Sequence, residues 1–207
     1  ADVVCLQEVM GSGEAPDART QYEYLADTLW TEFAYGKNAV YSDGHHGNAI
    51  LSRYPILSFE NINISTNRFE QRGLLHAEIV IPTTDKRIHL LCVHLNLLEG
   101  GRQAQLKKIS SRIREFVPEN APLILAGDFN DWRQTASSTL SRELHLNEAF
   151  KTKHGQYCRS FPSFFPILTL DRIYMRGLET HSALCLTDVP WSTISDHNAL
   201  LVELTIS

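Results

Sequence analysis

The sequence has no apolar run near the roughly 20 residues that a membrane-spanning helix requires, so we expect no membrane span. Basic residues are not in excess either, because 19 Lys and Arg stand against 24 Asp and Glu and leave a net charge of −5. Such a chain lacks the positive field by which many proteins hold nucleic acid. A bound metal ion would supply its own positive charge, so nucleic acid is disfavoured as a partner but not excluded.

Internal repeats, low-complexity tracts and linkers rich in Gly, Ser or Pro are also missing. The chain has 207 residues, of which 43% are hydrophobic, and this is enough for one substantial core. We therefore expect one domain over residues 1–207, present as a monomer. The chain opens on Ala1 and enters an apolar segment at once, so a signal peptide can be neither seen nor excluded.

Closely spaced cysteine pairs, which are typical of zinc sites and redox dithiols, do not occur. The four cysteines are Cys5, Cys92, Cys158 and Cys185, and the first two lie in apolar segments typical of strands. Reduced cysteines, at least two of them packed in the core, are favoured over a disulfide framework. Reduced cysteines indicate a reducing compartment, so we expect a cytoplasmic location.

Short apolar segments recur at intervals typical of a sheet-rich fold. The segments on either side of Pro82-Thr83-Thr84-Asp85 predict a long antiparallel hairpin, because polar turn residues separate two β-rich stretches. The expected strands are Val3–Leu6, Ala49–Leu51, Leu74–Ile81, Arg87–Leu95, Leu123–Ala126, Arg172–Met175 and Ala199–Ile206.

Helical periodicity is clearest from Gly101 to Val117, where apolar residues recur at steps of three and four. They are Leu106, Ile109, Ile113 and Phe116. Pro118 ends this helix, and two further helices are expected over Gln21–Trp30 and near Ser137–Leu144. Antiparallel strands with flanking amphipathic helices predict an α+β fold of packed sheets with helices outside.

The segment Leu123–Trp132 combines an apolar strand, a glycine and then Asp128 and Asn130, which are separated by one residue. At strand spacing the two side chains point to the same side. A carboxylate there can orient or deprotonate a water, and the amide can donate to a phosphoryl oxygen. An Asx turn that caps the following helix explains the same residues equally well.

A second polar group, Ser195-Asp196-His197-Asn198, precedes the strand Ala199–Leu204. Asp196 and His197 can supply a metal ligand and an imidazole acid, base or phosphate donor, although a surface loop is as common an explanation. Asp171 stands at the head of another apolar strand, where it is either a satisfied edge residue or the partner that orients a histidine.

Glu8 follows the first apolar segment, and its carboxylate suits Mg²⁺ or Mn²⁺ rather than zinc. His94 lies near the end of a strand, where a core histidine is a commoner explanation than a phosphate contact. Taken alone, each polar residue is weak evidence. Together, five segments each place such a residue at a strand end, and strand ends that meet at one rim would form a single cleft.

The order of these motifs resembles the endonuclease/exonuclease/phosphatase superfamily, from the first residues almost to the last. As a set the motifs are specific. They are Leu6-Gln7-Glu8, Gly47-Asn48-Ala49-Ile50-Leu51-Ser52-Arg53, Val93-His94-Leu95, Gly127-Asp128-Phe129-Asn130, Leu170-Asp171-Arg172-Ile173-Tyr174 and Ser195-Asp196-His197. The resemblance implies a four-layer α/β/β/α sandwich of two mostly antiparallel sheets, with the active site at one edge of the paired sheets.

The resemblance also implies a metal-dependent phosphoesterase. By similarity, Glu8 would be the main Mg²⁺ ligand, and Asp196 would support metal or leaving-group binding. Asp128 would align and activate the attacking water, and Asn130 would contact the scissile phosphate.

Further roles are implied by the same similarity. Asp171 and His197 would form the hydrogen-bonded pair that stabilises the transition state, and His94 would hydrogen-bond a phosphate oxygen. Asn48 and Arg102 are weaker candidates for substrate binding, and Arg102 is equally consistent with a surface charge at a helix end.

One departure from the family pattern concerns the start of the chain. Members of the superfamily normally begin with a core strand whose asparagine helps to hold the metal, and this chain begins one strand later. Loss of a central strand would expose apolar surface and unpaired backbone groups. We therefore expect the natural protein to carry a further N-terminal strand and helix.

The substrate is less well determined than the chemistry. Residues 160–166 combine aromatics and prolines before Asp171, and they are either a substrate-binding wall or a loop anchor; Trp132 and Trp191 carry the same ambiguity. The acidic net charge favours a lipid headgroup, a small molecule or a specialised nucleic acid over bulk DNA. The alternative function is a non-catalytic relative that binds phosphorylated ligands or a protein.

Overall fold

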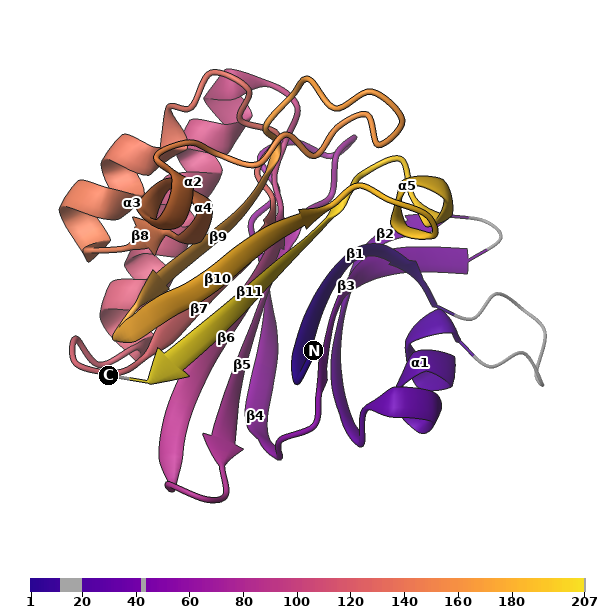
Figure 1. Cartoon of the computed structure of the whole chain (residues 1–207). Coiled ribbons are helices and arrows are strands. Elements are labelled where there is room, and N and C mark those ends of the chain that lie inside the picture. The colour runs from indigo at the N-terminus through magenta and orange to yellow at the C-terminus, as the bar shows by residue number, and fades with distance from the viewer. Residues whose placement is uncertain (12–19, 42–43, 207) are drawn as a thin grey trace.

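The computed structural model of the protein describes residues 1–11, 20–41 and 44–206. Within these residues the strands form sheets of six, three and two strands. Figure 1 shows the sheets at the centre of the molecule and helices on the two outer sides.

The largest sheet has the strand order β4-β5-β6-β7-β9-β8. Neighbouring strands are antiparallel except β6 and β7, which are parallel and are connected by the long helix α2 (Glu99–Phe116). This arrangement brings the ends of β6 and β7 and the start of β9 to one edge. The strands are β4 (Ile56–Asn63), β5 (Gly73–Ile81), β6 (Lys86–His94), β7 (Leu123–Asp128), β9 (Asp171–Arg176) and β8 (Asn147–Glu148).

The three-stranded sheet has the order β1-β3-β2 and packs against one face of the largest sheet. Its strands are β1 (Val3–Met10), β2 (Glu32–Tyr41) and β3 (Gly44–Ser52), paired antiparallel. Strands β10 (Leu178–Leu186) and β11 (Ala199–Ile206) form the antiparallel two-stranded sheet. Buried apolar side chains of β3, β5 and β6 fill the space between the two larger sheets.

Helices cover the outer faces. Helices α2 and α3 (Ala136–Leu144) pack on the free face of the largest sheet through a continuous apolar core, and α1 (Gln21–Leu29) packs on the three-stranded sheet. Helix α4 (Ala149–His154) contacts β9 and β10, and α5 (Trp191–Ile194) is a single short turn. The predicted four-layer α/β/β/α sandwich is thereby confirmed.

The predicted helices and the hairpin are present, with shifted ends. The long helix begins at Glu99 rather than Gly101, and its apolar side chains Leu106, Ile109 and Ile113 are buried as expected. Phe116 is the exception: it is 49% exposed, and the guanidinium of Arg112 lies 3.6 Å from its ring centroid. The hairpin around Pro82 joins β5 to β6 with Ile81 opposite Lys86.

Several elements were not expected from the sequence. They are β2, β4, β8, β10, α4 and α5. Strand β4 is largely exposed and β10 is mostly half-buried, and polar and charged residues interrupt the apolar pattern by which a strand is recognised. These segments form strands because one face of each packs against the rest of the fold. That packing cannot be read from the local sequence.

The expectation of four reduced cysteines is wrong for one pair. Cys158 and Cys185 form a disulfide with their Cα atoms 6.1 Å apart; Cys158 follows α4, which packs on β10. Cys5 and Cys92 are free, and Cys92 is fully buried as expected. The expected cytoplasmic location rested on reduced cysteines and loses that support. None of the described helices has the length and hydropathy needed to cross a bilayer.

Candidate active site

Three predicted site residues lie in one row across the largest sheet. His94 ends β6 and is the register partner of Asp128, which ends the parallel strand β7. Asp128 is in turn opposite Asp171, which begins the antiparallel strand β9. Strand pairing therefore places an imidazole and two carboxyls side by side at one edge of the sheet.

Asp128 is a buried acid without a basic ion-pair partner among the described residues. Its Oδ1 accepts a hydrogen bond from the backbone N–H of Asn130 at 2.7 Å, and its Oδ2 lies 3.4 Å from Nε2 of His94. Burial and the nearby charge of Asp171 raise the pKa of Asp128 to about 7. A carboxyl with this pKa exchanges a proton near neutral pH, as a general base must.

At the end of β7 the backbone of Gly127 lies very close to that of Val93 on β6. A Cβ at Gly127, where φ is +140°, would lie 2.0 Å from the carbonyl oxygen of Val93, so only glycine fits there. Asn130 adopts a left-handed φ of 49°, and its Nδ2 donates to the carbonyl of Leu95 at 2.9 Å. Asp128 thus forms the Asx turn that the sequence left open. A different acid, Asp131, caps the following helix, because its carboxylate accepts from Ala136 N–H at 2.8 Å.

Asp171 and His197 form the predicted pair: His197 Nδ1 lies 2.8 Å from Asp171 Oδ2. Burial by itself lowers the pKa of His197, but the hydrogen bond and charge of Asp171, with the charges of Asp128 and Asp196, outweigh it and raise the pKa to about 9. The imidazole is therefore protonated at neutral pH. Because Nδ1 is engaged by Asp171, Nε2–H is left to donate elsewhere.

His94 has the opposite charge state. Burial, followed by the charges of Arg72, His197 and His46, lowers the pKa of His94 to about 3, so the ring is neutral. Arg72 NH1 lies 3.3 Å from Nδ1 of His94, and a guanidinium only donates, so Nδ1 is the acceptor and Nε2 carries the hydrogen. That Nε2–H faces Asp128.

Glu8 reaches this row from the three-stranded sheet. The register of β1 against β3 shifts between Leu6 and Val9, and Glu8 has a positive φ of 56°. Such a bulge re-aims a side chain. The Glu8 carboxylate, 63% exposed, lies 3.6 Å from Nδ1 of His94.

These acids fit a hard divalent cation. Magnesium keeps several waters and commonly uses only one or two carboxylates together with substrate phosphate. Among residues 1–11, 20–41 and 44–206, no three His, Cys, Asp or Glu side chains are grouped as a complete metal centre. Glu8 and Asp128 both approach His94, so two carboxyl groups and an imidazole meet at this edge of the sheets.

The remaining predicted residues lie outside this row. Asp196 is exposed in the loop before β11; its carbonyl accepts from Ser163 N–H at 2.7 Å, and its charge contributes to the raised pKa of His197. Asn48 is buried between the sheets, and its Nδ2 donates to the main-chain carbonyls of Gly73 and Cys92.

Arg102 is not a surface charge. It is 1% exposed, and it donates to the carbonyls of Asn96 and Leu97 and pairs with Glu99 at 2.6 Å. These contacts fix the loop that follows β6. Its guanidinium also lies 4.8 Å from the ring of Trp132, which is 45% exposed.

Sequence reasoning missed Arg72, which contacts His94 and pairs with Glu70 at 3.0 Å. Arg72 precedes β5 in a polar stretch without an apolar pattern, so no local signal marked it. In the aromatic segment, Phe161 lies against His197 with ring centroids 4.8 Å apart, whereas Phe164 is 84% exposed.

Comparison with known proteins shows the class to which this fold and site belong. The model of the Endonuclease/Exonuclease/phosphatase family matches residues 1–197, and the chain belongs to this family. Members of the family are hydrolases that act on phosphoester bonds, typically with divalent metals. The resemblance inferred from the motifs is confirmed.

The chain is 48% identical over 212 residues to an uncharacterized protein, YbhP, of Escherichia coli K12, covering 99% of this chain and 83% of that protein. Among solved structures, an endonuclease/exonuclease/phosphatase of Bacteroides vulgatus superimposes with a TM-score of 0.80 at 21% identity, covering 100% of this chain and 85% of the other. The mannosyl-6-phosphatase Bt3783 of Bacteroides thetaiotaomicron superimposes with a TM-score of 0.75 at 17% identity, covering 99% and 85%. At these identities the structures show a shared fold.

Proposed function

We propose that this protein hydrolyses a phosphate ester with a water that Asp128 activates. The observation that carries the proposal is the separation of pKa values between Asp128, in the row, and His197, which pairs with Asp171 of that row. The pKa of Asp128 is raised to about 7 by burial, whereas that of His197 is raised to about 9 by Asp171 against the effect of burial. A base and a charged donor with separated pKa values are what acid–base chemistry on a phosphate needs.

In the proposed reaction, the carboxylate of Asp128 accepts a proton from water as the water oxygen bonds to phosphorus. The bond from phosphorus to the leaving oxygen breaks, and that oxygen takes a proton from solvent. The Nε2–H of protonated His197 donates to a non-bridging oxygen, where negative charge grows in the transition state. The neutral ring of His94 holds Asp128 in place through Nε2–H, and Asn130 orients the phosphate.

A divalent cation, Mg²⁺ or Mn²⁺, would be held by Glu8, with support from Asp196. When bound, it would neutralise phosphate charge and polarise the phosphorus–oxygen bond. The hard oxygen donors favour these ions over zinc.

The proposed substrates are small molecules, lipid headgroups or specialised nucleic acids rather than bulk DNA, because the chain carries a net charge of −5. The fold shared with a protein named mannosyl-6-phosphatase is compatible with a small phosphorylated substrate.

The test is hydrolysis of bis-p-nitrophenyl phosphate by the full-length natural protein with Mg²⁺ or Mn²⁺. We expect Asp128→Ala and His197→Ala each to lower kcat by at least about 100-fold. His181→Ala is the matched control, because His181 is exposed on β10 and its ring contacts Thr205. Equal rates in the wild type and the two site variants would rule the site out, and no hydrolysis by the wild type would favour a non-catalytic, phospholigand-binding protein.

A further inference from the structure

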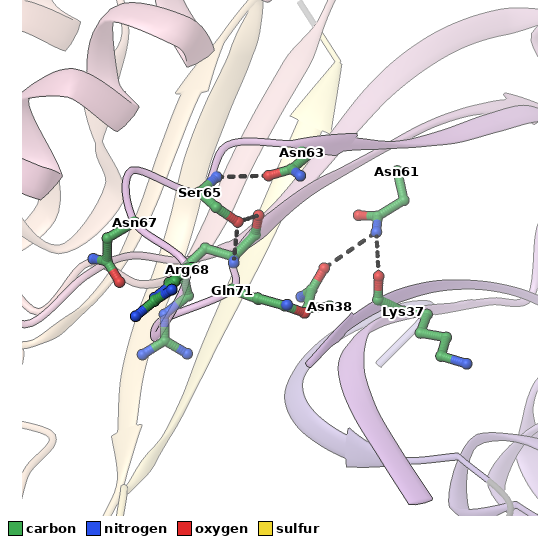
Figure 2. A pocket seen from close by; sticks show the side chains of 9 residues that line it. Lys37, Asn38, Asn61, Asn63, Ser65, Asn67, Arg68 and Gln71 are labelled. Atoms are coloured by element: carbon green, nitrogen blue, oxygen red, sulfur yellow. Dashed lines mark hydrogen bonds between the residues drawn. The ribbon is translucent and has the colours of Figure 1, made fainter. Parts of the chain in front are cut away.

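A polar cavity of about 430 Å³ opens between the loop that joins β4 to β5 and the strand β2 (Figure 2). It lies outside the row of acids and histidines. Among its lining residues are amides, one hydroxyl and cations, but no carboxylate and no aromatic ring. The nine lining residues are Lys37, Asn38, Asn61, Asn63, Ser65, Asn67, Arg68, Gln71 and Arg72.

The wall beside β2 is built around two asparagines. The β2–β3 register shifts between Lys37 and Ala39, which displaces Asn38 from regular pairing. Asn61 Nδ2 then donates to the carbonyl of Lys37 at 2.9 Å and to Oδ1 of Asn38 at 3.1 Å (Figure 2). A Cβ at Gly73 would lie 2.0 Å from Oδ1 of Asn38, so the absence of a side chain there makes room for this pair.

The opposite wall is the β4–β5 loop, and it is held in shape by its own polar groups. Ser65 N–H donates to Oδ1 of Asn63 at 2.8 Å, and Ser65 Oγ accepts from Arg72 N–H at 3.0 Å. Lys108 of α2 donates to the carbonyl of Ser65 at 2.9 Å. These hydrogen bonds hold the loop, and therefore its lining side chains, in position.

Two polar atoms of the lining residues are unpaired, and one exposed guanidinium has no ion pair among the described residues. Oδ1 of Asn61 and Nε of Arg72 are buried and have no hydrogen-bond partner within the part of the chain that the structure describes. The guanidinium of Arg68 lies 4.7 Å from the ring centroid of Phe69, and it forms no ion pair with any described residue. The Lys37 chain extends away from Arg68 and Gln71 in Figure 2, so Arg68 is the main source of uncompensated charge.

The side chains that line the cavity indicate the chemical class of its ligand. Amides both donate and accept, as the hydroxyls of a polyol require, and a guanidinium matches the oxygens of a phosphate or carboxylate. A nucleobase would be expected to stack on an aromatic side chain, and none of the nine residues is aromatic.

One residue, Arg72, belongs to the lining of the cavity and also contacts the site. Arg72 lines the cavity, and its NH1 contacts Nδ1 of His94, whose other nitrogen faces Asp128. We propose, building on the proposed function, that this cavity binds the polyol part of the substrate and that Arg68 holds a second anionic group on that polyol. The substrate class is therefore a polyol phosphate with an additional negative group, either free or as a lipid headgroup.

Binding without turnover tests this assignment on the full-length protein with EDTA present. By calorimetry, fructose 1,6-bisphosphate should bind roughly tenfold more tightly than fructose 1-phosphate, which is the factor expected for one charge-assisted contact. Flotation with phosphatidylcholine vesicles that contain either phosphatidylinositol or phosphatidylinositol 4-phosphate tests the lipid source. Preference for either doubly anionic probe supports the proposal and identifies the source; equal binding of each pair overturns it.

Two variants locate the contact. Arg68→Ala should remove the roughly tenfold preference for the bisphosphate, and Gln71→Glu should weaken bisphosphate binding while leaving the monophosphate unchanged. Both residues are exposed, so the variants are expected to fold. Arg114→Ala is the matched control, because Arg114 pairs with Glu143 on exposed helical surface. A preference that survives Arg68→Ala, or that Arg114→Ala also removes, contradicts the assignment.

The two proposals fail in different ways. If hydrolysis of bis-p-nitrophenyl phosphate is lost in the site variants but the bisphosphate preference does not exist, the cavity assignment is wrong and the proposed function stands. If no hydrolysis occurs and Arg68-dependent binding does, the protein is a polyol phosphate-binding relative.

Discussion

Replacing Asp171 by asparagine should remove the positive charge of His197 at neutral pH. Burial lowers the pKa of this imidazole, and the hydrogen bond and charge of Asp171 are the largest effects that raise it to about 9. A rise from 6.5 to about 9 corresponds to about 3 kcal/mol, at about 1.4 kcal/mol per pKa unit. In the isosteric Asp171→Asn variant burial persists, so we expect the pKa of His197 at or below 6.5.

The imidazole can be followed directly by NMR titration of the metal-free protein, with His197→Ala to assign its resonance. In turnover with Mg²⁺, kcat of the variant at pH 7.5 should fall by about 100-fold, which is the effect of about 3 kcal/mol of lost transition-state stabilisation. The ratio of wild-type to variant kcat should narrow toward pH 5.5, because a larger fraction of His197 is protonated in the variant there.

The pH dependence of the free energy of unfolding provides an independent measurement of the interaction between His197 and Asp171. Because the folded-state pKa of His197 is raised, the stability that this group contributes is fully present below pH 6.5 and is lost as pH rises through about 9. Wild type should exceed the variant by at most about 3 kcal/mol near pH 6, since relief of Asp171–Asp128 repulsion offsets part of the loss. A His197 pKa in Asp171→Asn within half a unit of the wild-type value would refute this reasoning.

Three further predictions concern the metal, the buried acid and the packing. EDTA should abolish hydrolysis, and Mg²⁺ or Mn²⁺ should restore it better than Zn²⁺; restoration by zinc alone would contradict the oxygen-ligand assignment. Burial and Asp171 raise the pKa of Asp128 to about 7, so its ionisation costs folded stability increasingly from about pH 4 to pH 7. Asp128→Asn should therefore lose activity yet unfold at the same or a higher temperature at pH 8 without metal, and a lower unfolding temperature would count against that pKa. Phe129 is fully buried with its ring edge-on to Tyr174, so Phe129→Ala should lower the free energy of unfolding by about 3–5 kcal/mol in urea titration, whereas a loss below about 1 kcal/mol would show that this contact is unimportant.

The sequence alone indicated the layered fold and most of the residues in the row at the sheet edge. Short apolar segments such as Leu123–Ala126 are typical of buried strands, because their buried backbone groups need partners and the segment is too short for a helix. The polar residues that end them, Asp128 and His94 among them, stand out because an acid or imidazole beside a buried strand requires an explanation. Their order along the chain then indicated the family.

Tertiary structure alone decided which groups meet and in which charge state. Burial and the pairing of Asp128 with Asp171 across β7 and β9 raise the pKa of Asp128, and neither cause is visible in either segment by itself. Arg72 reaches His94 because β5 lies beside β6, and no local pattern marks it. The Cys158–Cys185 disulfide likewise depends on two segments brought together by folding. Sequence patterns report burial of nearby residues, whereas distances between remote side chains depend on how whole sheets pair and pack.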